Sequence, residues 1–285
     1  MASHVNPTVR RRRLGQELRR LRELKGMTAE AVAERLLVSQ SKISRLENGR
    51  RSISQRDVRD LCGVYEVEDQ RVVDSLMQMA KESRQQGWWH AFGDLPYSVY
   101  IGLETDAASV RNYESLLVPG LLQTREYAEA VIERIEPEAA PADKAKRVEV
   151  RMKRQERIHD PVSPLRFWAV VDESALHRVV GSPRIMREQL EQLIELSHRP
   201  HVTVQVLPYS VGAHPGMVGT FSLLEFADAA DSSVVYLEGV TSDLYLEKHA
   251  EVQHYSVMYE HLRAQAHHPE RTRQFMTELA KEYAS

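Results

Sequence analysis

The first 85 residues contain apolar positions that recur with the 3.6-residue period of an α-helix. Leu14, Leu18, Leu21 and Leu24 follow one another at spacings of four, three and three, so they form a single apolar stripe. The pattern predicts five consecutive short helices. Their expected positions are about 10–25, 28–36 and 39–48, a fourth helix that begins at Ser54, and 68–85.

Polar and small residues mark the expected ends of these helices. Thr28 and Ser39 are of the type that caps helix N-termini. Gly26 and Gly49 stand where the first and third helices should end, Gly49 in the left-handed conformation that glycine favours. The second and third helices are therefore separated by a turn of only a few residues.

The composition of the chain changes after Gln86, where aromatic and turn-forming residues follow closely, and we place the predicted domain boundary there. We expect helices over 100–160, where 100–135 is interrupted at Pro119–Gly120, a strand-containing region over 161–240, and C-terminal helices over 247–284. The four expected strands are 165–171, 202–207, 218–226 and 233–237, and helices are expected at 173–180 and 183–198. The predicted fold is mainly α, with a five-helix domain over 1–86 and an α+β domain with a four-stranded sheet over 87–285.

The charge of the chain is unevenly distributed along it. Residues 1–62 contain 15 Lys and Arg against 7 Asp and Glu, so they carry +8 and the remainder carries −11 of the net −3. A basic segment on an acidic body is typical of a polyanion-binding module with a separate partner module. A solvated basic helix is the plainer alternative.

Two further features of the sequence indicate where in the cell the protein is expected. The single cysteine, Cys62, forms no intrachain disulfide, which favours a reducing compartment. No stretch approaches the roughly 18 consecutive apolar residues that span a bilayer. We therefore expect a cytoplasmic, nucleoid-associated protein that does not enter a membrane.

The segment from Thr28 to Asn48 meets the requirements of a helix-turn-helix. Ala33 allows the two helices to approach, and Ile43 and Leu46 direct one side of the second helix inward. The outer side then consists of donor-rich side chains that suit base edges in the major groove. These are Gln40, Ser41, Lys42 and Arg45.

The motifs L-R-x-L-R-x-x-x-G and V-S-x-S-x-I-S-R-L-E-N-G fall in register, and residues 10–85 resemble the xenobiotic-response-element family of regulators, which includes phage repressors and Cro proteins. The resemblance implies base-facing positions at Ser39, Gln40, Ser41 and Arg45, and a buried structural ion pair between Arg22 and Glu47. A helical hairpin used only for protein contacts is the alternative.

One position departs from the family, which commonly has Gln at the start of the second helix where this chain has Ala29. A phosphate contact is therefore expected to be missing there. Other residues are expected to contact phosphates instead, unless they merely solvate the surface. These are Arg10, Arg11, Thr28, Arg50 and Arg51.

The rest of the chain resembles the WhiJ-like group of actinomycete regulators, through A-S-V-R-N-Y-E-S-L-L-V-P-G-L-L-Q-T-R-E-Y-A, R-x-x-R-Q-E-R-I and L-P-Y-S-V-G-A-H-P-G-M-V-G-T-F-S-L-L-E-F. This resemblance implies a role in development or secondary metabolism. It also implies pairing with a small protein encoded nearby, in a manner likened to antitoxin and toxin.

The residue patterns of the second domain do not favour a catalytic site or a metal site. His198, His201 and His214 are poorly spaced for a metal site, and Ser210 with His214 and Asp228 lacks the glycine pattern of a nucleophile elbow. Asp172 and Glu173 follow a strand and precede a helix, where acidic residues commonly cap and complement the dipole. We predict no enzyme activity, no metal and no cofactor.

A binding surface is the favoured role for the second domain. The connection 209–219 joins two expected strands and contains Gly and Pro. The candidate ligand or partner residues are Trp88, Trp89, Tyr113, Tyr209 and His214. Trp88, Trp89, Tyr97, Tyr113 and Trp168 are candidates for an apolar pocket, with plain core as the alternative.

The sequence thus predicts a sequence-specific DNA-binding transcriptional regulator. It is expected to bind double-stranded operator DNA as a homodimer, and to be modulated by a small molecule or small protein through its C-terminal domain. An antitoxin-like protein that autoregulates its own operon is the alternative.

Overall fold

The computed structural model describes residues 7–49, 51–84, 87–93, 95, 97–228 and 231–284, with side chains from residue 11 onward. The chain divides into two compact units, residues 1–106 and residues 107–285. The domain boundary predicted at residues 86 and 87 from composition stays a prediction.

The described part of the first unit begins with the five helices that the sequence predicts. They are α1 Pro7–Leu24, α2 Ala29–Arg35, α3 Gln40–Glu47, α4 Gln55–Val64 and α5 Gln70–Glu82, followed by the 3-10 helix η1 Trp88–Phe92 and α6 Ser98–Asp106. Their inward residues form one apolar core, in which Leu14, Leu18, Val32 and Val58 are fully buried. The predicted five-helix arrangement is confirmed.

Side-chain caps define where these helices begin. Thr28 accepts a hydrogen bond from the Ala31 amide at 3.1 Å, and Ser39 accepts one from the Lys42 amide at 3.2 Å. Ser54 and Asp57 form a reciprocal capping box at the start of α4. The backbone turns of the unit are thus fixed by groups adjacent in sequence.

The turn between α2 and α3 depends on a leucine in the left-handed region. Leu37 has a φ of 53° and is 94% exposed. Its amide bonds to the Glu34 carbonyl at 3.2 Å, and the Val38 amide bonds to the Ala33 carbonyl at 2.9 Å. This is the Schellman pattern that glycine usually completes, so the turn is formed at the cost of local strain.

Residues 107–228 and 231–284 form a six-stranded mixed sheet with helices. The strands, in the order β3-β2-β1-β4-β5-β6, are β1 Ser109–Glu114, β2 Arg166–Asp172, β3 Val202–Leu207, β4 Phe221–Glu225, β5 Val234–Leu237 and β6 Leu244–Leu246. β1 pairs in parallel with β2, and β2 with β3, whereas the pairings of β1 with β4, β4 with β5 and β5 with β6 are antiparallel. The α+β character of this domain is confirmed.

The sheet has two strands more than the sequence predicted. The interpretation of 100–135 as helices was wrong for 109–114, which form the central strand β1. Both faces of β1 are covered, so its apolar positions do not alternate cleanly. β6 has only three residues at the sheet edge and is too short to give a pattern.

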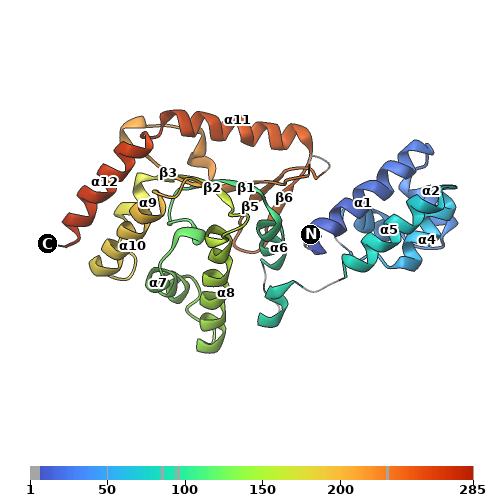
Figure 1. The fold of residues 1–285 in the computed structure, drawn as a ribbon, viewed down its shortest axis with the longest axis horizontal. Helices are drawn as coiled ribbons and strands as arrows, with labels where there is room; N and C mark the ends of the chain where they lie inside the picture. Colours follow the sequence, from blue (N-terminus) through green and yellow to red (C-terminus); the bar gives the residue numbers. More distant parts are fainter. Residues whose placement is uncertain are drawn as a thin grey trace. The chain divides into compact units, whose positions relative to one another are not determined.

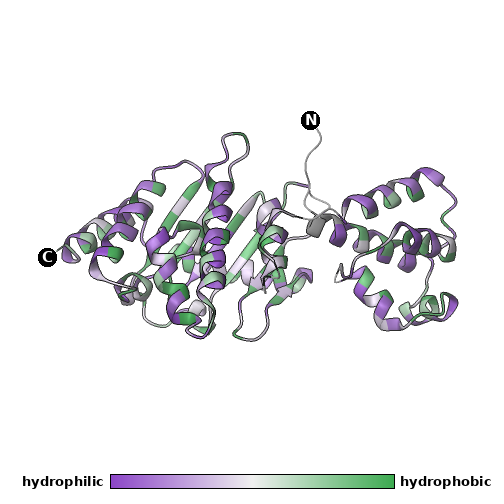
Figure 2. Ribbon diagram, turned by 90° about the horizontal axis from the view of Figure 1, so that it is seen from below, coloured by the Kyte–Doolittle hydropathy of each residue, from purple (hydrophilic) through white to green (hydrophobic). Residues whose placement is uncertain are grey.

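Helices cover both faces of the sheet. Figure 1 shows α11 His249–Gln265 along one face, and α7 Arg125–Ile135 and α8 Pro141–His159 on the opposite side. The remaining elements of this unit are the helices α9 Glu173–His177, α10 Pro183–Leu196 and α12 Pro269–Glu282, with the 3-10 helices η2 Gly120–Leu122, η3 Tyr209–Val211 and η4 Pro215–Val218. In Figure 2 the strands are largely green while the outer turns of the helices are purple, as expected for a buried sheet beneath amphipathic helices.

Contacts made by Tyr259 and Arg111 link α11 to the sheet. The Tyr259 hydroxyl donates to the Trp168 carbonyl at 2.8 Å, and the Arg111 guanidinium donates to the Ser256 hydroxyl at 3.2 Å and lies 5.7 Å from the Tyr259 ring. Helix α9 ends at His177, whereas the sequence predicted a helix that continues to residue 180. Residues 178–181 therefore form a loop, in which Gly181 has a φ of 73°.

Candidate nucleic-acid interface

Helix α3 has one buried side and one exposed polar side. Ile43, Leu46 and Glu47 are buried in the first unit. The exposed residues recur at the spacing of one helix face and continue into the C-cap. They are Gln40, Ser41, Ser44, Arg45 and Asn48.

Hydrogen bonds arrange part of this exposed face in advance. The Arg45 guanidinium donates to the Ser41 carbonyl at 3.1 Å and to the Ser41 hydroxyl at 3.2 Å. The Ser41 hydroxyl lies 3.1 Å from that of Ser39, the N-cap of the helix. Arg45 is therefore held along the helix with the rest of its fork open to solvent, which is suited to bidentate recognition.

Lys42 is placed differently from its neighbours. Its ammonium group donates to Asp57 on α4 at 3.0 Å, and its side chain is only 27% exposed. Asp57 also belongs to the capping box of α4. Lys42 thus joins α3 to α4 in this structure, whereas the sequence placed it on the outer face.

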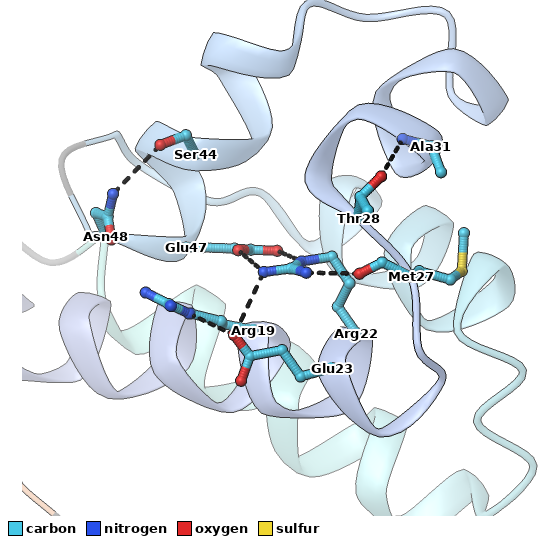
Figure 3. Close-up of polar contacts among 9 residues, drawn as sticks. All are labelled: Arg19, Arg22, Glu23, Met27, Thr28, Ala31, Ser44, Glu47 and Asn48. Atoms are coloured by element: carbon cyan, nitrogen blue, oxygen red, sulfur yellow. Dashed lines mark hydrogen bonds and ion pairs between the residues drawn. The ribbon is translucent and has the colours of Figure 1, made fainter.

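An ion pair between α1 and α3 supports the end of α3. The Arg22 guanidinium donates to both carboxylate oxygens of Glu47, at 2.7 and 2.9 Å (Figure 3). It also donates to the Met27 carbonyl at 2.6 Å, at the entrance to α2. This is the pair implied by the family resemblance, and Arg22 connects α1 both to α3 and to the loop before α2.

A glycine allows α1 to approach α3 closely. A Cβ atom at Gly15 would lie 2.4 Å from the Glu47 carbonyl oxygen and 2.7 Å from that of Leu46. These are backbone atoms that cannot rotate away. Gly15 is therefore required by the close contact between the two helices rather than by its own dihedral angles.

The residues predicted to contact phosphates are found in different environments. Thr28 and Arg51 are exposed. Arg11 is directed inward, donating to the Ser83 carbonyl at 3.5 Å, and its burial lowers the pKa of its guanidinium. The Arg10 side chain and Arg50 lie outside the described residues.

Sequence reasoning missed two members of the exposed face. Ser44 lies one turn beyond Gln40, and Asn48 lies one turn beyond Ser44, whose hydroxyl accepts a hydrogen bond from the Asn48 amide at 3.3 Å. The helical period would have found them, because positions four residues apart share a face.

The candidate ligand residues are distributed over both units. Trp88 and Trp89 lie in η1 of the first unit, with ring centroids 5.9 Å apart, and Trp89 is buried. In the second unit Tyr113 is buried and Tyr209 is 58% exposed. His214 lies 3.5 Å from Asp172. The proposed surface formed by these five residues stays a prediction, as does the aromatic pocket.

Other polar residues of the second unit that the sequence analysis considered contact groups close to them in the structure. Asp172 caps α9 by accepting from the Ser174 amide at 3.0 Å. His214 lies beside Asp172, and a ring nitrogen of His201 lies 2.9 Å from the Ile158 carbonyl. Among the described residues no three His, Cys, Asp or Glu side chains lie close enough together to hold a metal ion.

Comparison with protein families places two models on the chain. A helix-turn-helix domain matches residues 13–76, and a domain of unknown function, DUF5753, matches residues 97–278. Comparisons with curated proteins and with solved structures gave no match. Within the part of the chain described by the structure, no helix is long and apolar enough to cross a membrane.

Proposed function

Because the chain belongs to the family of proteins that carry the domain of unknown function DUF5753, here preceded by a helix-turn-helix domain, we propose that it is a sequence-specific DNA-binding transcriptional regulator. The observation that carries the proposal is the exposed polar face of α3. In a helix-turn-helix, the second helix lies in the major groove and reads base edges from such a face.

We assign the base contacts to exposed residues of α3 and of its two caps that do not bond to α4. Arg45 is the principal candidate, because an arginine fork recognises guanine bidentately. The others are Ser39, Gln40, Ser41, Ser44 and Asn48. Lys42 is assigned a positioning role through Asp57, since its ammonium group is already paired.

Phosphate contacts are assigned to exposed residues on either side of α3. Thr28 stands at the start of α2, and Arg51 follows α3. Arg11 is left out, because its guanidinium is directed toward the end of α5. The balance of +8 over residues 1–62 supports attraction to a polyanion, and this part of the affinity should fall with added salt.

The second unit is assigned the reception of a signal and the contacts of a homodimer. The second unit has more acidic than basic residues, which disfavours contact with DNA. This charge and the size of the unit support the assignment. A role in development or secondary metabolism, and the antitoxin-like alternative, rest on the resemblance to WhiJ-like regulators. Co-expression with the product of a neighbouring small reading frame tests that alternative, since an antitoxin-like protein must form a stable complex with it.

Genome-wide mapping of bound DNA followed by anisotropy titration tests the main proposal. Arg45→Ala should cost about 1–3 kcal/mol on the mapped site and little on random DNA. Arg51→Ala should weaken both DNAs and reduce the salt slope by about one. Arg71→Ala is the matched control, because Arg71 lies on α5 and is paired with Asp69.

Two results would count against the proposal. Equal binding to every DNA fragment would contradict sequence-specific recognition. Equal weakening of mapped and random DNA by Arg45→Ala would show that Arg45 contacts phosphate alone.

A further inference from the structure

The second unit has a groove of about 580 Å³ at the end of α7. It is lined by the last two turns of α7, by Leu117, and by the loop 178–181. Its volume lies within the range of about 300–1,000 Å³ that is usual for small-molecule sites.

The groove lies beyond the carboxyl ends of two strands of the sheet. Leu117 follows the carboxyl end of β1, and the loop 178–181 follows α9, which begins where β2 ends. β1 and β2 are adjacent parallel strands. In open sheets with parallel strands, ligands commonly bind in crevices outside the carboxyl ends of these strands.

The groove wall is largely apolar. Leu117, Ala130, Val131 and Val180 contribute to it. Its rim holds two further apolar side chains that stay exposed, Ile135 at 62% and Val179 at 52%. A hydrocarbon group seated here would remove this apolar surface from water.

The charges on the groove are positive, although the body of the protein is acidic. Arg134 and Arg178 line the groove, and among the described residues neither forms an ion pair. The one acidic residue of the lining, Glu133, is paired with Lys144 at 3.0 Å. The groove thus offers two uncompensated guanidinium groups beside an apolar wall, which complements an anion with a hydrocarbon part.

From this combination we propose that the groove binds an amphiphilic carboxylic acid. The hydrocarbon chain lies along Leu117, Val131 and Val180, and the carboxylate is bound by Arg178 with Arg134 in support. The area is small for a protein partner, whose stable interface buries about 800 Å² on each side. The claim concerns binding by the second unit and holds whether or not the chain binds DNA.

Calorimetric titration of the full chain with octanoate, hexanoate and octanol tests the proposal. Octanoate should bind with a stoichiometry of one. Hexanoate should bind about tenfold more weakly, because each lost methylene lowers affinity about threefold. Octanol, which has the same chain without the charge, should also bind at least about tenfold more weakly than octanoate.

Three variants separate the groove from the rest of the surface. Arg178→Gln should lower octanoate affinity about tenfold and leave octanol unchanged. Val179→Asp should abolish octanoate binding, because it places a negative charge at an exposed rim position that tolerates a polar side chain. Arg184→Gln is the matched control, since Arg184 is an exposed residue of α10 paired with Glu188.

The proposal is overturned by any of four results. The first three are equal affinity for octanoate and octanol, unchanged octanoate binding in both Arg178→Gln and Val179→Asp, and no octanoate binding up to about 10 mM. The fourth is binding of several equivalents, because it would indicate adsorption in the manner of a detergent.

Discussion

Arg22 and Glu47 lie 25 residues apart in the chain and form a bidentate ion pair inside the first unit. The side chains are only 11% and 5% exposed. Glu47 is the last residue of the candidate recognition helix α3, and Arg22 lies on α1. The orientation of α3 therefore depends on a charge pair that never needs to touch DNA.

The first prediction concerns the cost of breaking this pair. Arg22→Met should destabilise the first unit by about 3–5 kcal/mol, because it leaves the Glu47 carboxylate buried without a counter-charge. Urea unfolding of the full chain, followed by far-UV circular dichroism, measures the loss. Arg22→Met combined with Glu47→Leu should recover more than half of it. An equal loss in the single and double variants would show that packing, not charge, is what Arg22 contributes.

The second prediction concerns the approach of α1 to α3. Gly15→Ala should cost about 1–3 kcal/mol, because its Cβ would meet the carbonyl oxygens of Leu46 and Glu47. Gly63→Ala is the matched control. Gly63 also lies within a helix but has nothing near its Cβ position, so this change should stabilise by about 0.5–1 kcal/mol. The same sign for both variants in thermal unfolding would contradict the close contact.

The third prediction concerns the strained turn before α3. Leu37→Gly should raise stability by about 1 kcal/mol, because Leu37 has a positive φ and its side chain is exposed. Leu24→Gly is the control, since Leu24 is an exposed leucine in the last turn of α1. There the same change should lower stability by up to about 1 kcal/mol. The two variants are compared by chemical unfolding, and destabilisation by Leu37→Gly would show that the turn carries no strain.

The first unit could be predicted closely because its signals are local. Helical period, caps at Thr28 and Ser39, and Gly49 each act within a few residues, and together they define the helices. The outer face of α3 was predicted for the same reason. Lys42 departs from the prediction because its partner, Asp57, lies on another helix, and only tertiary structure brings the two together.

The second unit could be predicted less well because its signals are non-local. β1 is covered on both faces, so its residues do not show the alternation of a half-exposed strand. The groove at α7 combines residues around 117, 130–135 and 178–181, and no local motif connects these segments. Its unpaired arginines could be recognised only once the partners of the neighbouring charges were known.

The fourth prediction concerns Glu114, the last residue of β1. Burial raises the pKa of Glu114 from about 4.5 to about 8; the nearby Glu238 also raises the pKa, while the hydrogen bond from Asn112 and the charge of Arg151 act against the rise. A carboxyl group with a raised pKa in the folded state disfavours folding once the unfolded chain ionises. Its cost is therefore nil below about pH 4.5, grows as the pH rises toward 8, and is constant above that.

Glu114→Gln removes this ionisation while keeping the shape of the side chain. The free energy of unfolding of the variant, relative to the natural chain, should therefore rise between about pH 4.5 and pH 8 and then level off. Glu149→Gln is the control, because Glu149 is exposed, is paired with Arg125, and has a lowered pKa that places its titration below this window. Urea unfolding at a series of pH values measures both. A constant difference for Glu114→Gln across the window would mean that Glu114 ionises in the folded protein as it does in water.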